Sequence, residues 1–439
     1  MPFARIGEAC DITMSTLYGK IDFFHRQALA FAATRERRLL RGFKKHRLYV
    51  ATDRQDYMVN WTGRTDKRNV TLSAVATADL QSGFVFGMHL NYDPGLDRAA
   101  VEVEAQQGGD PQIAAPFRRY ARLWLECDYL RSVLDTQTRR QARSGQRDQA
   151  AVYADSVARP DPESSEEYDQ GRKLPDQGMQ VHSEYTLYAH FLLLRQLFQG
   201  VGKVRFYMDQ ESGIRAACLA AFQDRVRARE VDAFYVRINK DATVTERRAL
   251  VAQARHRFQS ACQAHPHLTE FEVQQLLMRQ EIANASVIGK WKDRWLVHPL
   301  PSKAEPQKAV CYLTDFQDYT PDHLASLYLK ASIHAVDRFF MLIRRRISLL
   351  ERPIGSASAG RIWHGYAAYN PANIVKLLEI FRVAYNYVWA GQDGKTPAMR
   401  LGLARGPIAL EDLLYFEERA EPPRQRQKVD RSGGGKAAS

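Results

Sequence analysis

The sequence predicts an α+β fold built on a mixed β-sheet, and three observations support this prediction. Runs rich in β-branched and aromatic residues, bounded by turn residues, lie mainly in the first half of the chain. Segments with apolar residues at helical spacing follow these runs and fill much of the region from 324 to 389. Two insertions interrupt the pattern, and without them the order of elements is β-β-β-α-β-α-β-α.

Residues 1–45 predict a helix-turn-helix module that comes before the sheet. Residues 3–10 predict a short helix, and a second helix follows a tight turn. Ser15 and Thr16 suit the N-cap of this second helix, because a hydroxyl accepts a hydrogen bond from a free backbone N–H. The helix that usually precedes such a pair is missing, so we expect a truncated module or a late start. An ordinary helical hairpin is the alternative.

The first half of the predicted core covers residues 46–135. It contains a three-stranded meander, and Asp53 directly follows the first strand, so that a carboxylate marks its end. The strands are predicted at 48–52, 70–78 and 83–90. Apolar spacing then predicts a helix over 116–134.

The second half of the core covers residues 183–242. It comes after a polar insertion at 136–182, which we expect to be flexible because it lacks apolar periodicity. Helices are predicted at 185–198 and 213–222, and strands at 204–208 and 232–238. Asp209 directly follows the first of these two strands.

Residues 243–322 predict a mostly helical insertion with a strand-like stretch near 291–297. We expect this insertion to interrupt the core rather than extend it. The core closes in 323–405, and 406–439 predicts a basic, partly disordered tail. The helices of the closing region are predicted at 324–351, ended by Pro353, and at 371–389.

The composition favours a nucleic-acid-binding protein. A net charge of +13, from 63 Lys and Arg against 50 Asp and Glu, points to a polyanionic partner. The five cysteines are scattered and form no CxxC pair, which argues against a disulfide framework and fits a reducing compartment. No stretch approaches the roughly 18 apolar residues of a membrane span. The sequence therefore predicts a cytoplasmic protein without a membrane partner.

Two aspartates are the first candidates for a catalytic site. Asp53 follows the first predicted strand and Asp209 the fourth, and in a sheet with this order those strands are neighbours. Two carboxylates on adjacent strands lie about 4–7 Å apart and can hold a divalent cation jointly. Because like charges at this distance raise each other's pKa, a metal ion is the natural partner of the pair.

A third acid is expected from the helix that packs beside these strands. Asp337 lies on the border of its apolar face, which directs the carboxylate toward the sheet edge. Arg344, Arg345 and Arg346 supply positive charge further along the helix. A solvated flank is the alternative role for Asp337. The apolar face is marked by Ile333, Val336, Phe340, Ile343, Ile347 and Leu350.

The chain resembles the transposases of bacterial insertion sequences that have a DDE-type, RNase H-like catalytic core. Several short motifs carry the resemblance, and their order along one chain is stronger evidence than any one of them. The motifs are Thr16-Leu-Tyr18, Tyr49-Val-Ala-Thr-Asp53, Arg205-Phe-Tyr-Met-Asp209, Val336-Asp-Arg-Phe-Phe, Arg344-Arg-Arg-Ile-Ser-Leu-Leu-Glu351, Tyr385-Asn-Tyr-Val-Trp389 and Lys395-Thr-Pro-Ala-Met-Arg-Leu-Gly-Leu403.

The resemblance implies a fold, a mechanism and a set of partners. The core would be an RNase H-like mixed sheet in which Asp53, Asp209 and Asp337 are catalytic and hold two Mg²⁺ ions, with Mn²⁺ able to substitute. Water as nucleophile would nick the element's end, and a DNA 3′-hydroxyl would join it to target DNA. The protein would act on double-stranded DNA as a homodimer or larger assembly, associated with the bacterial nucleoid. The residues expected to contact DNA are Ser15, Thr16, Tyr18, Lys20, Arg344, Arg345 and Arg346.

The sequence also departs from the family pattern. The third acid is Asp where the family usually has Glu, so Glu246, Glu272 and Glu351 remain alternatives to Asp337. The long separations between the acids imply an insertion in each interval. Two other functions stay open, namely a non-catalytic DNA-binding regulator and a structure-specific nuclease or resolvase with the same fold.

A structural zinc site is not expected. Cys262, His265 and His267 are closely spaced and Cys311 offers a fourth ligand, but a second pair at zinc-finger spacing is absent.

Two further signals favour structural roles over nucleic-acid binding. Trp291 and Trp295 have the ring surface to stack on a base, although core packing is favoured at their spacing. The arginines of 139–147 are able to bind phosphates, although a solvated linker is the default for such a run.

Overall fold

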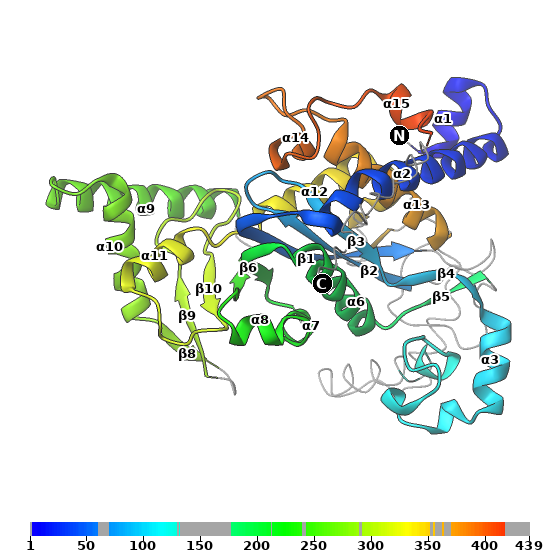
Figure 1. Ribbon diagram of the computed structural model, residues 1–439, viewed down its shortest axis with the longest axis horizontal. Helices are drawn as coiled ribbons and strands as arrows, with labels where there is room; N and C mark the ends of the chain where they lie inside the picture. The colour runs from blue at the N-terminus through cyan, green and yellow to red at the C-terminus, as the bar shows by residue number, and fades with distance from the viewer. Residues whose placement is uncertain are drawn as a thin grey trace, which may run out of the picture.

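The computed structural model describes residues 2–59, 70–129, 131, 177–211, 213–238, 243–288, 292–351, 354–355, 362–363 and 370–417. An eight-stranded mixed sheet runs through the molecule in the order β3-β2-β1-β6-β7-β10-β9-β8 (Figure 1). Helices cover both of its faces, so the protein has the predicted α+β fold. The strands are β1 (Lys45–Val59), β2 (Val70–Asp79), β3 (Val85–Leu90), β6 (Val201–Asp209), β7 (Val231–Arg237), β8 (Ser286–Ile288), β9 (Asp293–Val297) and β10 (Ala309–Tyr312).

The first five strands of the sheet have the neighbours that the sequence predicts. β1, β2 and β3 form an antiparallel meander, whereas β6 is parallel to β1 and β7 is parallel to β6. β1 does not end at Asp53 as predicted. It continues to Val59, because Gln55, Tyr57 and Val59 stay buried at alternate positions and keep the strand against the core.

Residues 243–322 extend the sheet, so the prediction that this region interrupts the core is wrong. β10 is antiparallel to β7, and β9 and β8 follow as further antiparallel strands at the same edge. β8, β9 and β10 have only 3, 5 and 4 residues, and strands this short leave little alternation in the sequence. α9 (Val244–Ala264) lies beyond this edge and contains no fully buried residue.

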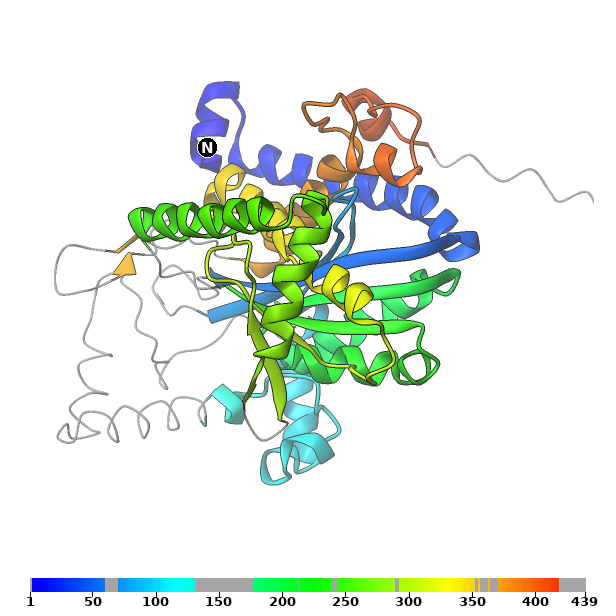
Figure 2. The ribbon, with the colours of Figure 1, turned by 90° about the vertical axis from the view of Figure 1, so that its left-hand side faces the viewer.

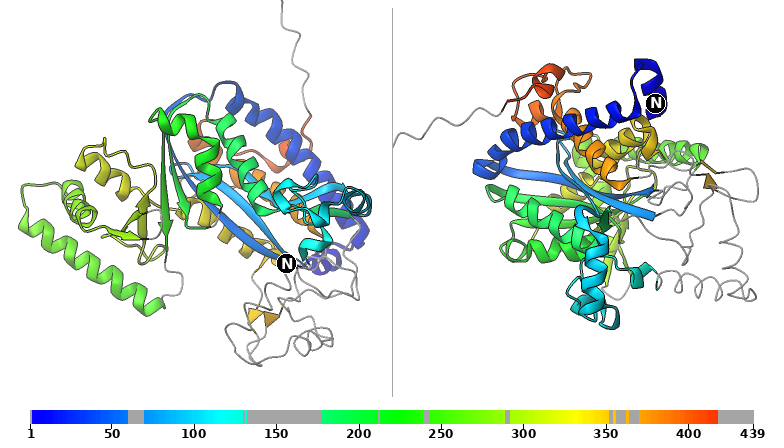
Figure 3. Two further views of the ribbon diagram at one scale, coloured as in Figure 1. Left: turned by 90° about the horizontal axis from the view of Figure 1, so that it is seen from below. Right: turned by 90° about the vertical axis from the view of Figure 1, so that its right-hand side faces the viewer.

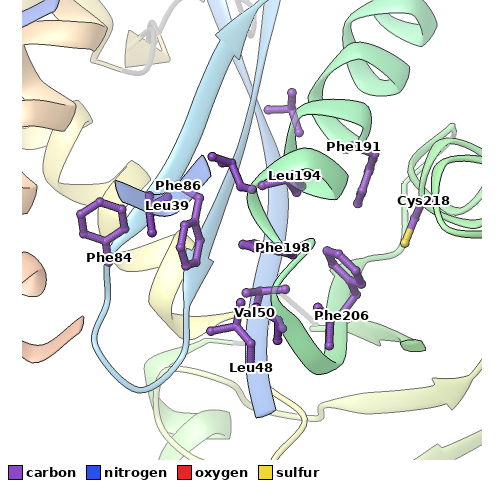
Figure 4. Close-up of a cluster of buried hydrophobic side chains, with 14 of the residues drawn as sticks. Leu39, Leu48, Val50, Phe84, Phe86, Phe191, Leu194, Phe198, Phe206 and Cys218 are labelled. Atoms are coloured by element: carbon purple, nitrogen blue, oxygen red, sulfur yellow. The ribbon is translucent and has the colours of Figure 1, made fainter. Parts of the chain in front are cut away.

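The two faces of the sheet carry separate helical layers. One layer consists of α6 (Ser183–Leu197), α7 (Ile214–Ala221) and α8 (Gln223–Arg227), and the other of α10 (Glu270–Ala283), α11 (Pro321–Leu329) and α12 (His334–Arg346). Figure 4 shows the core of the first layer, in which Phe191 of α6 and Phe198, directly after this helix, meet Val50 of β1 and Phe206 of β6. The predicted helices at 185–198 and 213–222 are confirmed as α6 and α7.

Two helices, α11 and α12, occupy the region where apolar spacing predicts one long helix. α11 ends at Leu329 and α12 begins at His334. Buried Glu305 holds the break, because its Oε1 accepts hydrogen bonds from the Ile333 N–H (2.9 Å) and the Ser332 hydroxyl (2.6 Å). Since Glu305 comes from a distant loop, helical periodicity alone does not reveal this break.

α13 (Pro371–Tyr387), which matches the predicted helix at 371–389, packs against β3 and against α2 (Met14–Gly42). Arg382 joins these helices by donating to Glu36 of α2 (2.8 Å) and Glu379 of α13 (2.6 Å). All three side chains are largely buried. The C-terminal half of α2 is therefore part of the central core.

The N-terminal region contains the two predicted helices, α1 (Phe3–Cys10) and α2, joined by a tight turn. The predicted N-cap is wrong, because Thr13 caps α2 by accepting from the Thr16 N–H (3.2 Å), which leaves Ser15 and Thr16 inside the first turn. Figure 2 shows α1 and the start of α2 standing clear of the sheet. The DNA-binding role of this region stays a prediction.

A small lobe lies at the opposite end of the molecule from α9 (Figures 1 and 3). Its elements are β4 (Tyr92–Asp97), α3 (Arg98–Gln107), η1 (Asp110–Gln112), η2 (Ala115–Phe117) and β5 (Gln177–Gln180). The predicted helix at 116–134 is wrong for residues 118–125, which form turns. Buried Arg118 pairs with Asp128 (2.7 Å), and the Asp110 carboxylate accepts from the backbone N–H of Arg119 (3.0 Å) and of Tyr120 (2.9 Å).

The remaining elements complete the described chain. α14 (Pro397–Leu401) and α15 (Leu410–Leu414) pack on α13 and α2, and β11 (Ile354–Gly355) pairs with β12 (Ile362–Trp363). Most of the predicted flexible insertion, Pro353 and residues 418–439 of the predicted tail lie outside the described residues. In the part of the chain that is described, no helix has both the length and the apolar character needed to cross a bilayer.

Candidate active site

The parallel pairing of β1 with β6 makes Asp53 and Asp209 neighbours. Thr52 pairs with Met208, and the aspartates are the next residue along each strand. Neighbouring strands lie about 4.8 Å apart. The structure therefore brings together two acids that are far apart in the sequence.

Asp53 and Asp209 both lie on the sheet face that α12 covers. Alternate residues of a strand share a face, and Ala51 and Tyr207, two positions before the respective aspartates, belong to the core cluster under α12. Asp53 is only 3% exposed, whereas Asp209 is half-buried. The two carboxylates therefore sit at the boundary between the core and solvent.

A second link between the strands lies just beyond the aspartates. Arg54 of β1 pairs with Glu211, which follows β6 (Nε to Oε2, 2.7 Å). Both side chains are mostly shielded from solvent, at 19% and 29% exposure. The ion pair holds the end of β6 against β1 and so restricts the position of Asp209 relative to Asp53.

α12 brings Asp337 over β1. Its buried residues, which include Val336 and Phe340, pack on β1 and β2 and leave Asp337 half-buried beside the strand. Asp337 and Asp53 line one cavity of about 220 Å³, here called the acidic cavity. Asp209 is outside this lining. The other lining residues are Arg54, Gln55, Asp56, Tyr57, Met58, Arg344, Leu349, Leu350 and Glu351.

The acidic cavity contains polar residues that the sequence analysis missed. Arg344 donates a hydrogen bond to the Gln55 side chain across the cavity. Burial raises the pKa of Tyr57, although the positive charge of Arg344 acts in the opposite direction. The sequence carries little signal for these residues, because four polar residues from Asp53 to Asp56 are followed by three apolar ones with no alternation, whereas the folded strand buries Gln55 and Tyr57 on the face of Asp53.

The three alternative acids have different positions. Glu246 and Glu272 each close a capping box at the start of α9 and α10, where they accept from the backbone N–H of Thr243 (2.6 Å) and Thr269 (2.7 Å). These hydrogen bonds lower the pKa of both carboxyl groups. Because the helix caps account for Glu246 and Glu272, Glu351 is the alternative that the acidic cavity contains.

The acids fit a magnesium ion held by two carboxylates. Among the described residues, no three His, Cys, Asp or Glu side chains come close enough together to form a metal site. Mg²⁺ usually takes one or two carboxylates and completes its shell with water and substrate phosphates. Asp53 and Asp209, which are adjacent across the β1–β6 ladder, and Asp53 and Asp337, which line one cavity, are the candidate pairs of oxygen ligands. The predicted set of three remains a prediction.

The weaker sequence signals lie mainly in structural positions. Cys311 is buried in the core on β10, and the described residues contain no zinc site that would use it with Cys262. Trp295 is mostly buried and stacks on Tyr235 at 6.2 Å between ring centroids, as a core residue would. Trp291 and the arginines of 139–147 lie outside the described residues.

The predicted DNA-contacting residues fall into two groups. Those at the start of α2 are exposed, and Tyr18 packs edge-on against Phe3 of α1 at 5.9 Å. On α12, Arg345 is exposed, while the Arg346 guanidinium carbon lies 4.3 Å from the ring centroid of Trp389. The first group consists of Ser15, Thr16, Tyr18 and Lys20. Their role in DNA binding stays a prediction.

A buried polar network supports β1 from the face opposite the acidic cavity. The Thr52 hydroxyl is hydrogen-bonded to that of Thr77 (2.8 Å), which contacts Nε2 of His190 (2.7 Å). His190 and His89 are in turn joined through their Nδ1 atoms (2.8 Å). Burial lowers the pKa of His89 to about 4 and lowers that of His190 as well. Both rings are therefore neutral in the folded protein at neutral pH.

Comparisons with protein-family models, with curated proteins and with solved structures found no match. The function therefore has to be inferred from the acidic cavity itself, its place in the sheet and the chemistry of its side chains. A buried carboxylate on a central strand, with further carboxylates and an arginine around it, suits a site for a metal ion and a phosphorylated substrate.

Proposed function

We propose that the protein is a Mg²⁺-dependent enzyme that cuts and joins DNA, and specifically a DDE/DDD-type transposase with an RNase H-like core. The observation that carries this proposal is the position of Asp53 next to two acids that are remote from it in the sequence. Asp53 is adjacent to Asp209 across the β1–β6 ladder and shares the acidic cavity with Asp337. Hard oxygen ligands on neighbouring central strands suit divalent-metal phosphoryl transfer.

The topology of the sheet also supports the proposal. An antiparallel meander of β1 to β3, followed by the parallel strands β6 and β7, gives the strand order that an RNase H-like core requires. In this order the first and fourth strands are central neighbours, and a helix late in the chain packs over them. The short strands β8 to β10 are an addition at the far edge.

The side chains of the cavity have distinct roles under this proposal. Asp53, together with Asp209 and Asp337, would hold magnesium, and Mn²⁺ is expected to substitute. When bound, magnesium would lower the pKa of an attacking water or align a 3′-hydroxyl, and would stabilise the leaving oxygen. Arg344 would bind a phosphate oxygen, because a guanidinium supplies several donors in a fixed plane.

The decisive experiment compares Asp53→Asn with Asp224→Asn, a matched change at an exposed carboxylate on α8. Nicking of supercoiled plasmid is measured with Mg²⁺, with Mn²⁺ and with EDTA, and DNA binding is measured in parallel. We expect Asp53→Asn to abolish metal-dependent nicking and to retain binding, and Asp224→Asn to match the wild-type protein. Equal nicking by Asp53→Asn and the wild-type protein refutes the site.

The same assay separates the proposed transposase from the two alternative functions. A regulator binds DNA and shows no nicking with either metal. A structure-specific nuclease or resolvase cuts branched DNA and never joins a 3′-end to target DNA. Joined products in the presence of Mg²⁺ are expected only from a transposase.

A further inference from the structure

A second, larger cavity lies on the other side of α12 from the acidic cavity. It has a volume of about 560 Å³ and is here called the basic groove. Its walls are the turn at 80–83 between β2 and β3, the segment 330–346 that includes α12, and the segment 385–400, which runs from the last turn of α13 into α14. The groove is therefore built from three segments that are remote in the sequence.

The lining of the basic groove is strongly cationic. It contains Lys330, Arg338, Arg346 and Arg400, and within the described part of the chain no carboxylate lines it. Arg400 is paired with Asp393 outside the lining (2.6 Å). Arg338 and Arg346 are exposed and form no ion pair with any described residue.

The groove holds its cations in defined positions. The Arg346 guanidinium carbon lies 4.3 Å from the centroid of the Trp389 ring, and Trp389 packs edge-on against Phe381 of α13 (4.9 Å). Such a contact fixes the plane of a guanidinium and leaves its outer N–H groups free to donate. Burial raises the pKa of the Tyr385 hydroxyl, while the nearby charges of Arg338 and Arg400 act to lower it.

The spacing of the cations indicates an extended polyanion. Arg338 and Arg346 are eight residues apart on one side of α12, which is about 12 Å along the helix axis. A DNA strand places one phosphate about every 3.4 Å along its axis, so this distance spans roughly three to four nucleotides. This backbone spacing suits a strand that presents several phosphates in a row better than it suits a single phosphate group.

We propose that the basic groove binds the phosphate backbone of a DNA strand next to the acidic cavity. The identity of the polymer rests on the proposed function, whereas its charge and extended shape follow from the groove. Asp337 and Arg338 are consecutive residues of α12 and point about 100° apart around the helix. A strand in the groove therefore lies about one helix diameter from the proposed metal ligands.

The groove continues toward the sheet through Lys330. The Lys330 ammonium lies 4.8 Å from the ring centroid of Tyr49, and the Arg205 guanidinium carbon lies 5.2 Å from the same ring. Asp232 pairs with Arg205 (3.0 Å) and largely neutralises its charge. Lys330 is therefore the exposed cation beside Tyr49. The cationic surface thus extends past α12 on the side away from Asp53.

The test measures the affinity of the full chain for a fluorescent oligonucleotide, both single-stranded and as a duplex, in EDTA. Arg338→Glu and Arg346→Glu are compared with Arg227→Glu, an equal charge reversal at an exposed position of α8 on the other face of the sheet. We expect each groove variant to weaken binding about tenfold and to lower the salt slope of the affinity by about one. Arg227→Glu should change the affinity by less than about twofold.

Two results would overturn the groove assignment. One is that all three variants lose affinity equally, or that no variant loses affinity, while thermal unfolding confirms that each variant is folded. The other is an acidic peptide that binds the wild-type protein as tightly as DNA does and loses affinity in the same variants. Because DNA binding is measured without metal, it tests the groove separately from catalysis. If the groove assignment fails while the wild-type protein still nicks DNA, the proposed function of the acidic cavity is unaffected. If the wild-type protein does not nick DNA but binds it through the groove, only the enzymatic function is refuted.

Discussion

The acidic cavity and the basic groove share α12 as a wall, yet they differ in volume, charge and in how the core supports them. The acidic cavity, of about 220 Å³, is built mainly from β1 and the two ends of the α12 region. Apart from α12, the basic groove, of about 560 Å³, is built from a turn and from the segment that begins in the last turn of α13, with little contribution from the sheet. Carboxylates gather in the first and cations in the second.

The difference shows how one helix can serve two kinds of ligand. Asp337 and Arg344 face the acidic cavity, while Arg338, Leu342 and Arg346 face the basic groove at a spacing of four. Between them, the apolar face of α12 packs on the sheet. A net charge of +13 alone does not reveal this separation. The carboxylate of α12, Asp337, faces the acidic cavity together with Arg344, whereas the charged residues of α12 that face the basic groove, Arg338 and Arg346, are both cations.

The largest expected effect comes from the residue that supports both sites. Phe339 is fully buried in α12, with ring centroids 5.8 Å from Phe381 and 5.1 Å from Tyr385. Phe339→Ala should lower the free energy of unfolding by about 3–5 kcal/mol, because it leaves a cavity under the helix. Urea denaturation measures this change.

The same variant tests whether α12 couples the two sites. We expect metal-dependent nicking and DNA affinity to fall together in Phe339→Ala, at a temperature where the variant is still folded. Val103→Ala, at an exposed apolar position in the small lobe, is the control. Loss of one activity with the other unchanged would show that the cavity and the groove are supported independently.

The next effect is a pH dependence that arises from the buried histidine pair beneath the acidic cavity. Burial lowers the pKa of His89 to about 4, with a further contribution from Arg382, whereas an unfolded histidine has a pKa near 6.5. The unfolded chain therefore binds more protons between these values. Stability is fully present above pH 6.5 and is lost as the pH falls toward 4, by up to ~3 kcal/mol for this residue.

The contribution of His89 can be separated from that of the other histidines by substitution. His89→Asn should show a smaller loss of unfolding free energy between pH 6.5 and 4 than the wild-type protein. His256→Asn, at an exposed position of α9, should show the wild-type slope. Identical slopes for all three proteins would mean that the His89–His190 pair takes no part in the acid sensitivity.

The order of elements made the β1–β6 half of the site predictable from the sequence. Each strand was long enough to show its pattern, and each led directly into its aspartate. Asp337 was placed correctly at the border of a buried helical face, because a spacing of three and four depends only on local sequence. These features needed no knowledge of distant contacts.

The features that the sequence did not reveal depend on distant partners. The break between α11 and α12 is held by Glu305, and the short strands at the far edge form by successive pairing, β10 on β7, β9 on β10 and β8 on β9. Arg344 enters the acidic cavity by meeting Gln55 of β1. The basic groove combines three remote segments, so no single motif in the sequence contains it.

The smallest expected effect concerns Trp389, which positions Arg346 in the groove. A partly exposed cation–π contact contributes about 0.5–1 kcal/mol, so Trp389→Ala should weaken DNA binding about two- to fivefold. The measurement is oligonucleotide affinity in EDTA. Trp389→Phe should keep most of the affinity because it retains an aromatic face.

A double-mutant cycle sharpens this prediction. If Trp389 acts through Arg346, then Trp389→Ala should have little effect on DNA affinity in an Arg346→Ala background. The coupling energy should then equal most of the loss of binding free energy that Trp389→Ala causes alone. Trp124→Ala, whose ring stacks on His182 in the small lobe, controls for the loss of an indole. Additive losses in the cycle would show that Trp389 contacts DNA itself, and the groove would then bind a base as well as phosphates.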